Sequence, residues 1–152
     1  MRSKVLNDIT KICFNYDCSV KRCVLHKGLL DEIDRYLKKN KFWTKLEYPI
    51  KFETIRRKDR EKIERSGFID LVGISNKLKV AIELDTGAHS KFKSIEKLLQ
   101  SKFDILIAIV GGRESDDKIL SSNLKRIRSV QNLNFKTVNL IILKNRFDKN
   151  VY

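Results

Sequence analysis

Apolar residues recur along the chain at two spacings, every three to four residues and every second residue, and the two spacings predict helices and strands. Helical spacing covers residues 4–15, 27–39 and 91–101, and a segment that starts at Ser115 or Asp116. Strand patterns cover residues 43–53, 68–75, 78–85, 103–110 and 135–143. This order of elements predicts an α/β sandwich, in which helices flank a central mixed sheet.

Several strands have features that place them in the sheet. Pro49 implies that the first strand lies at an edge or contains a bulge. The strands 68–75 and 78–85 are separated only by a turn at Asn76-Lys77, which predicts a hairpin. Residues 103–110 are apolar on both faces and belong in the middle of the sheet. The intervening residues 54–66 are highly charged and are interpreted as a connection.

Carboxylates occur on both strands of the predicted hairpin. Asp70 lies on the first strand, and Glu83 and Asp85 share the face of the second strand that is opposite its apolar residues. Carboxylates on buried strands are unfavourable unless a cation neutralises them. Oxygen ligands suit a hard divalent cation, so Asp70, Glu83 and Asp85 are candidate ligands for Mg²⁺ or Mn²⁺.

The charge of the whole chain indicates a polyanionic partner. Lys and Arg total 33 against 19 acidic residues, and the formal net charge is +14. Nucleic acid is the first candidate, with DNA favoured. Basic side chains before Asp70 and in the helix after Asp85 are candidates for backbone contacts. They are Arg56, Arg57, Lys58 and Lys91.

No segment of the sequence predicts a membrane protein. The longest apolar run, Ile105 to Val110, is too short to span a bilayer, and the first residues do not resemble a secretory signal. We therefore expect no membrane partner and an intracellular, cytoplasmic location. The sequence leaves both a monomer and a homodimer open.

The order of elements and the acidic residues together resemble the PD-(D/E)XK nuclease superfamily, which has a restriction-endonuclease-like fold with an αβββαβ core. Asp70 matches the Asp of the first motif, and Glu83 matches the acid of the second motif. The resemblance implies that both residues are catalytic and bind the metal. It covers about residues 26 to 112, so residues 26–152 are interpreted as one nuclease-like domain and residues 1–25 as an N-terminal helical extension.

The sequence departs from the family at the motif lysine, because Asp85 stands in its place. Some members of the superfamily supply this lysine from the next helix. Lys93 is the candidate here and Lys91 is the second choice, whereas Lys97 lies a turn further on and is expected to be solvated. Such a lysine would stabilise negative charge that develops in the transition state.

The leading hypothesis is a Mg²⁺- or Mn²⁺-dependent nuclease that hydrolyses phosphodiester bonds, with DNA as substrate. A second hypothesis is a non-catalytic nucleic-acid-binding module on the same fold, because the motif lysine is missing. A third is a zinc-stabilised interaction domain, in which three thiols and an imidazole complete a tetrahedral site. Its ligands would be Cys13, Cys18, Cys23 and His26, although small buried thiols are the simpler interpretation of the cysteines.

Overall fold

The computed structural model describes residues 1–18, 21–56, 58–86, 91–111, 116–131 and 136–143. The helices in these residues are α1 (Arg2–Asn15), α2 (Arg22–Lys39), α3 (Phe92–Gln100) and α4 (Asp116–Gln131). The strands are β1 (Trp43–Ile55), β2 (Lys62–Ile74), β3 (Lys79–Asp85), β4 (Ile105–Val110) and β5 (Val138–Ile142). No helix of the described chain is both long and apolar enough to cross a membrane.

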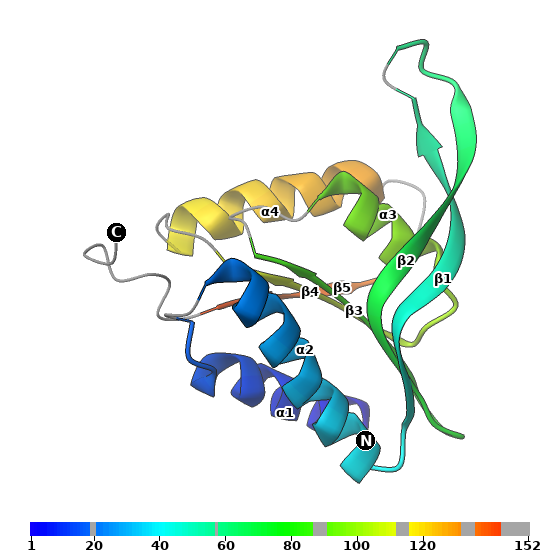
Figure 1. The fold of residues 1–152 in the computed structure, drawn as a ribbon. Coiled ribbons are helices and arrows are strands. Elements are labelled where there is room, and N and C mark those ends of the chain that lie inside the picture. The colour runs from blue at the N-terminus through cyan, green and yellow to red at the C-terminus, as the bar shows by residue number, and fades with distance from the viewer. Residues whose placement is uncertain (19–20, 57, 87–90, 112–115, 132–135, 144–152) are drawn as a thin grey trace.

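The five strands form one mixed sheet in the order β1-β2-β3-β4-β5. β1, β2 and β3 pair antiparallel, whereas β3, β4 and β5 pair parallel. Helices α1 and α2 cover one face of the sheet, and α3 and α4 cover the other (Figure 1). The α/β class, the mixed sheet and the flanking helices are therefore confirmed.

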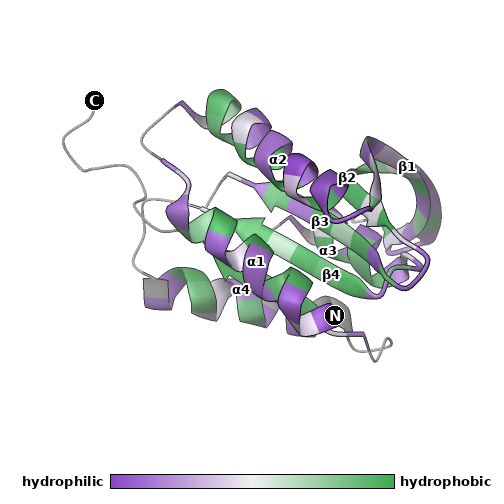
Figure 2. Cartoon of the chain, turned by 90° about the horizontal axis from the view of Figure 1, so that it is seen from below, coloured by the Kyte–Doolittle hydropathy of each residue, from purple (hydrophilic) through white to green (hydrophobic). Residues whose placement is uncertain are grey.

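Each face of the sheet has its own apolar core. Val5, Ile9 and Cys13 of α1 pack with α2 against one face, and Ile95 and Leu98 of α3 pack against the other. All six residues of β4 are buried, which confirms its predicted central position. Apolar residues accordingly dominate β3 and β4, while polar residues lie on the outer sides of the helices (Figure 2). The expected division after residue 25 falls inside α2, and α1 shares a core with the sheet.

The charged segment 54–66 differs from its prediction as a connection. Most of it extends β1 and β2, which pair from Trp43↔Ile74 to Ile55↔Lys62. Phe52, Thr54 and Ile63 alternate with charged residues in these strands, and this period of two is typical of a strand. The high charge obscured the alternation, so the prediction was wrong. The two strands form a ribbon that leaves the body of the protein (Figure 1).

The alternation of side chains along β2 changes phase at Asp70. Ile69 packs in the core beneath α3, whereas Leu71 packs in the core beneath α2, although residues two apart in a regular strand share a face. In β1, Glu47 precedes the residue paired with Ile69 and has φ 50°, a left-handed conformation that is rare for a residue other than glycine. Pairing of β2 with β3 also begins only at Leu71. Asp70 therefore lies at a bend, where β2 separates from β3.

Candidate active site

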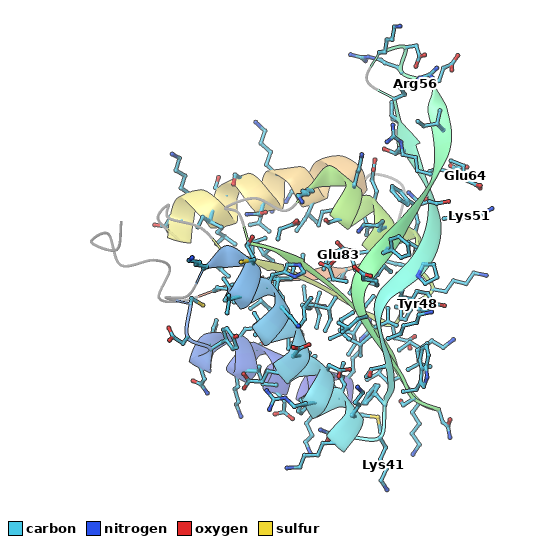
Figure 3. All side chains as sticks on the ribbon, in the orientation of Figure 1. Lys41, Tyr48, Lys51, Arg56, Glu64 and Glu83 are labelled. Carbon is cyan, nitrogen blue, oxygen red and sulfur yellow. The ribbon has the colours of Figure 1, made fainter. Side chains whose placement is uncertain are left out.

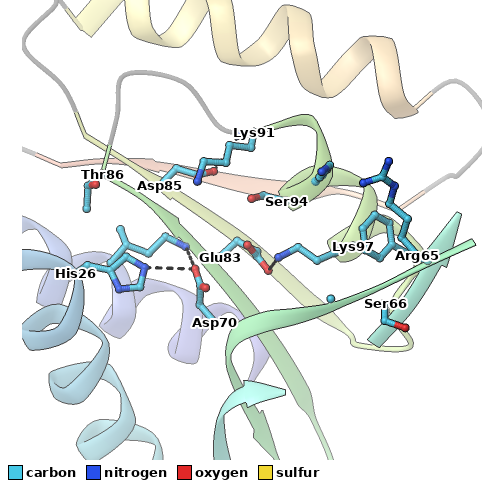
Figure 4. Close-up of a pocket in the computed structure, with 14 residues that line it drawn as sticks. His26, Arg65, Ser66, Asp70, Glu83, Asp85, Thr86, Lys91, Ser94 and Lys97 are labelled. Carbon is cyan, nitrogen blue, oxygen red and sulfur yellow. Dashed lines mark hydrogen bonds and ion pairs between the residues drawn. The ribbon is translucent and has the colours of Figure 1, made fainter. Parts of the chain in front are cut away.

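Asp70 occupies the gap that opens between β2 and β3. The backbone N–H of Leu84 in β3 donates a hydrogen bond of 2.8 Å to Asp70 Oδ2. The carboxylate thus takes the place of a backbone carbonyl of β2, which no longer pairs with β3 at this point. His26 Nε2, from α2, lies 3.7 Å from the same oxygen (Figure 4). Contact with Asp70 raises the pKa of His26 above its usual value, and partial burial opposes that shift. Both contacts hold the Asp70 side chain toward the C-terminal end of β3.

Glu83 follows Ile82, the last residue of β3 that is paired with β2, and lines the same pocket as Asp70. The Glu83 side chain is only 3% exposed, and its Oε1 atom lies 2.6 Å from Lys97 Nζ. Burial and then the charge of Asp70 raise the pKa of Glu83 to about 7, although Lys97 and Ser94 favour the charged form. The pocket therefore contains a carboxylate whose charge is only partly compensated.

Lys97 joins the two carboxylate-bearing strands. Besides its ion pair with Glu83, it donates a hydrogen bond of 2.5 Å to the carbonyl of Phe68 in β2. A Cβ atom at Gly67 would lie 3.1 Å from Phe52 Cε1, which is tighter than usual, so the glycine leaves room for the phenylalanine ring beside Lys97. The Lys97 side chain is 12% exposed, and the expectation that it is solvated was wrong. The error arose because Lys97 and Ser94 lie one turn apart on the side of α3 that faces Glu83.

Asp85 has a different set of contacts, although it shares a face of β3 with Glu83. Its Oδ2 atom accepts a 2.9 Å hydrogen bond from the backbone N–H of Lys91, the residue that caps α3. Its Oδ1 atom lies 3.8 Å from Lys91 Nζ, and the lysine side chain is 79% exposed. Asp85 thereby fixes the start of α3, which has no side-chain cap of its own.

Lys93, the predicted replacement for the motif lysine, is exposed and lines the same pocket as Glu83. No ion pair of Lys93 occurs within the described part of the chain, and that of Lys91 is with Asp85. The structure thus places three lysines of the α3 region at the pocket, and Lys97 is the one in contact with Glu83. The catalytic role of Lys93 stays a prediction.

The side chains above surround a pocket of about 580 Å³ (Figure 4). Its acids lie deep, because Glu83 and Asp85 are buried, and several of its cations are exposed at the rim. The pocket therefore has a buried floor of carboxylates and a rim of exposed positive charge. The residues that line the pocket are His26, Phe52, Arg65, Ser66, Gly67, Asp70, Glu83, Leu84, Asp85, Thr86, Lys91, Lys93, Ser94 and Lys97.

Sequence analysis did not identify three contributors to this pocket, which are His26 as a partner of Asp70, Ser94 and Lys97. His26 shares helical spacing with Leu30 and Ile33, which face the sheet, and this was a signal for its position. Ser94 and Lys97 are also spaced to lie on one side of a helix. Helical spacing alone could not show whether Lys97 or Lys93 contacts Glu83, because that depends on how α3 packs against the sheet.

The metal-binding residues gather less closely than predicted. Within the described ranges no group of three or more His, Cys, Asp or Glu side chains is arranged to hold a metal ion. Asp70, Glu83 and Asp85 therefore do not form a three-ligand site in this arrangement. The zinc site of the third hypothesis is not formed either in the described residues, because Cys13 and Cys18 are buried, Cys23 is exposed, and His26 faces Asp70. Burial raises the pKa of the Cys13 thiol to about 12, as is usual for a small thiol in an apolar core.

The predicted nucleic-acid contacts divide between two places. Lys91 lines the pocket, whereas Arg56 and Lys58 lie at the tip of the ribbon, away from Glu83 (Figure 3). Arg56 forms ion pairs there with Asp59 and with Glu61. Arg57 lies outside the described residues.

Comparison of the chain with known protein families, with curated protein sequences and with solved structures finds no match. The functional interpretation therefore depends on the geometry of the pocket.

Proposed function

We propose that this protein is a Mg²⁺- or Mn²⁺-dependent nuclease whose active site contains Asp70, Glu83 and Lys97. The observation that carries the proposal is the buried Glu83 carboxylate, which lines the same pocket as Asp70 and lies 2.6 Å from Lys97 Nζ. Phosphodiester hydrolysis requires a bound cation, an activated water and a positive charge beside the phosphate. The pocket contains two carboxylates that could hold the cation, a lysine, and a rim of exposed positive charge.

Two carboxylates are enough to hold a divalent cation, so the site does not require Asp85. Mg²⁺ is usually held by one or two carboxylates and keeps several waters, so Asp70 and Glu83 are sufficient. The buried Glu83 Oε1 atom lies 2.6 Å from Lys97 Nζ, a charge-assisted contact that fixes the carboxylate. A carboxylate has about four lone-pair sites, so Glu83 could keep this contact and still bind a cation. When bound, the cation would lower the pKa of a water and neutralise charge on phosphate oxygens.

The side chains of the protein supply the remaining functions. His26 and the backbone of Leu84 orient the Asp70 carboxylate. Lys97 places a positive charge at the floor of the pocket, where it would stabilise negative charge as the phosphodiester bond breaks. Arg65 and Lys93, both exposed at the pocket, provide charge that attracts the phosphate backbone.

The chain order supports a restriction-endonuclease-like core. From α2 to β4 the elements follow one another as helix, three strands, helix and strand, with the three strands antiparallel and the last strand parallel to β3. The acids lie on the second and third strands of this unit. This is the arrangement that the resemblance to the PD-(D/E)XK superfamily implies.

A non-catalytic nucleic-acid-binding module is the second candidate. The observation in its favour is that Lys97 already neutralises part of the Glu83 charge, so the pair could serve structure alone. Such a module would bind nucleic acid through the cationic rim and would not require a metal.

A cleavage assay on labelled duplex DNA, single-stranded DNA and RNA separates the two candidates. Wild-type protein should cut DNA with Mg²⁺ or Mn²⁺ and should be inactive in EDTA. Asp70→Asn should lose at least about 100-fold in rate, because the acid that holds the cation is gone. Asp34→Asn is the matched control, since Asp34 lies on α2 outside the pocket and pairs with Lys38. No cleavage under any metal, or full activity of Asp70→Asn, would overturn the nuclease proposal.

A further inference from the structure

The outer half of the β1–β2 pair is a free two-stranded ribbon. Its pairs run from Ile50↔Gly67 to Ile55↔Lys62, whereas β3 pairs with β2 only from Leu71 onward. At about 3.4 Å per residue, the free part spans on the order of 20 Å. One end of the ribbon borders the pocket through Arg65, Ser66 and Gly67, and the other projects away from the protein (Figure 1).

Contacts with α3 hold the ribbon in a fixed direction. The Gln100 side chain accepts a 2.7 Å hydrogen bond from the N–H of Glu53 and donates a 2.8 Å hydrogen bond to its carbonyl. Phe52 and Thr54, on either side of Glu53, are buried on the inner side of the ribbon. A ligand that binds the ribbon therefore meets a surface that is already ordered at its base, which reduces the entropy lost on binding.

The charge of the ribbon is unbalanced after its own ion pairs are formed. Glu53 pairs with Lys62 at 3.5 Å, and Glu64 pairs with Lys51 at 3.6 Å. At the tip, Arg56 forms ion pairs with both remaining acidic residues of the ribbon, Asp59 and Glu61. Three exposed bases of the ribbon then have no ion pair within the described chain. They are Lys58, Arg60 and Arg65.

We propose that the ribbon of residues 50–67 lies in the major groove of duplex DNA and thereby makes duplex DNA the substrate class. This inference rests on the proposed function, because the base of the ribbon borders the same pocket. The major groove of B-DNA is wide enough for a two-stranded ribbon, whereas that of A-form RNA is too deep and narrow for side chains to read. Lys58 and Arg60 contact phosphates at the tip, and Arg65 holds the backbone beside the pocket.

Binding in EDTA tests the ribbon without any cleavage. The probes are a fluorescent duplex DNA, its single strand, and an RNA duplex of the same sequence. The double variant Lys58→Gln/Arg60→Asn removes both tip charges, and asparagine tolerates the left-handed conformation of Arg60, which has φ 57°. We expect about a tenfold loss of affinity for duplex DNA and a salt dependence shallower by about 2 in log–log slope. Affinity for single strands should change less than about threefold.

Lys39→Gln/Lys45→Gln is the matched control, with the same loss of charge on exposed residues. These residues flank Lys41, which lies at the opposite end of the molecule from Arg56 (Figure 3). The control should bind duplex DNA within about twofold of wild type, and circular dichroism should show that both double variants are folded. Equal losses in the two double variants, or equal affinity of wild type for DNA and RNA duplexes, would overturn the inference.

The failure of the ribbon inference is distinguishable from the failure of the nuclease proposal. If wild type cuts DNA and the tip variant binds and cuts duplex as wild type does, the ribbon is not the duplex-binding element and the nuclease proposal stands. If the tip variant loses duplex binding but wild type cuts nothing with any divalent metal, the ribbon inference stands and the nuclease proposal fails.

Discussion

Two carboxylate–lysine pairs lie two residues apart on one face of β3, and they differ in almost every physical property. Glu83 Oε1 is 2.6 Å from Lys97 Nζ, and both side chains are largely buried, at 3% and 12% exposure. Asp85 Oδ1 is 3.8 Å from Lys91 Nζ, and that lysine is 79% exposed. Asp85 is buried, at 9% exposure, but the Lys91 ammonium lies in solvent, so water and salt screen this pair and it contributes little to stability.

Burial and hydrogen-bond partners give Glu83 and Asp85 different roles, although both are acidic residues on the same face of β3. Asp85 accepts a hydrogen bond from the backbone N–H of Lys91, and this contact holds the start of α3. Glu83 receives no such backbone hydrogen bond among the described residues, and burial beside Asp70 raises its pKa to about 7. A buried carboxylate with incomplete compensation is typical of a functional site, whereas a carboxylate that caps a helix is typical of structure.

Replacement of the two acids should separate these roles most clearly. Glu83→Gln keeps the shape of the side chain but removes the charge that binds a cation, so the cleavage rate should fall by about 1,000-fold or more. Asp85→Asn keeps an oxygen that accepts the Lys91 hydrogen bond, and it should retain activity within about tenfold of wild type. The measurement is the single-turnover rate on duplex DNA in Mg²⁺. Equal losses in both variants would instead make Asp85 part of the active site, as the sequence predicted.

Replacement of the two lysines should give a smaller but equally specific difference. Lys97→Met removes the charge at the pocket floor and should slow cleavage by about 100-fold, while DNA binding in EDTA changes less than about threefold. Lys91→Met should be close to wild type, since its charge lies in solvent. Rate and affinity are measured separately, because a lysine that acts on the transition state changes the rate more than the affinity.

Lys93→Met decides between the sequence prediction and the geometry. If Lys93 fills the role of the motif lysine, this variant should carry the rate defect and Lys97→Met should not. We expect the reverse, because Lys97 contacts Glu83 and Lys93 is exposed at the rim. If both Lys93→Met and Lys97→Met cut DNA at the wild-type rate, neither lysine has the proposed role in the mechanism.

The sequence was sufficient to place the acids but not the lysine. Asp70 and Glu83 lie on strands joined by a short turn, and a hairpin brings such residues together with little freedom in register. The buried strand β4 and the apolar faces of α1 and α2 were likewise evident from periodicity. The side of α3 that faces β3 depends on how the helix packs, and helical spacing alone does not determine that angle.

The ribbon and the bend at Asp70 were missed for a different reason. Strand propensity in residues 54–66 is obscured by charge, although the pairing of β1 with β2 places opposite charges side by side, as in Lys51–Glu64 and Lys62–Glu53. The left-handed backbone of Glu47 has no local sequence signal, since glutamate rarely adopts it. Strain of this kind persists only where the surrounding structure enforces it, and it often occurs beside a functional site.

The smallest expected effect concerns the stability of the metal-free protein as a function of pH. Burial and the charge of Asp70 raise the pKa of Glu83 from 4.5 to about 7 in the folded state. Between these two values the folded protein binds more protons than the unfolded chain, so the free energy of unfolding should fall as pH rises from about 4.5 to about 7. Above about pH 7 this contribution should level off, with a total loss of roughly 3 kcal/mol, since each pKa unit corresponds to about 1.4 kcal/mol.

Glu83→Gln isolates this contribution, because glutamine does not titrate and still fills the site. Urea denaturation in EDTA at pH 4.5 and pH 8 gives the free energy of unfolding of each protein, and the variant should gain stability relative to wild type at the higher pH by that amount. Mg²⁺ at pH 8 should then stabilise wild type but not the variant, since a ligand that binds only the folded state raises its stability. If the difference between the two proteins does not change with pH, Glu83 is compensated as fully as Asp85, and the contrast between the two pairs disappears.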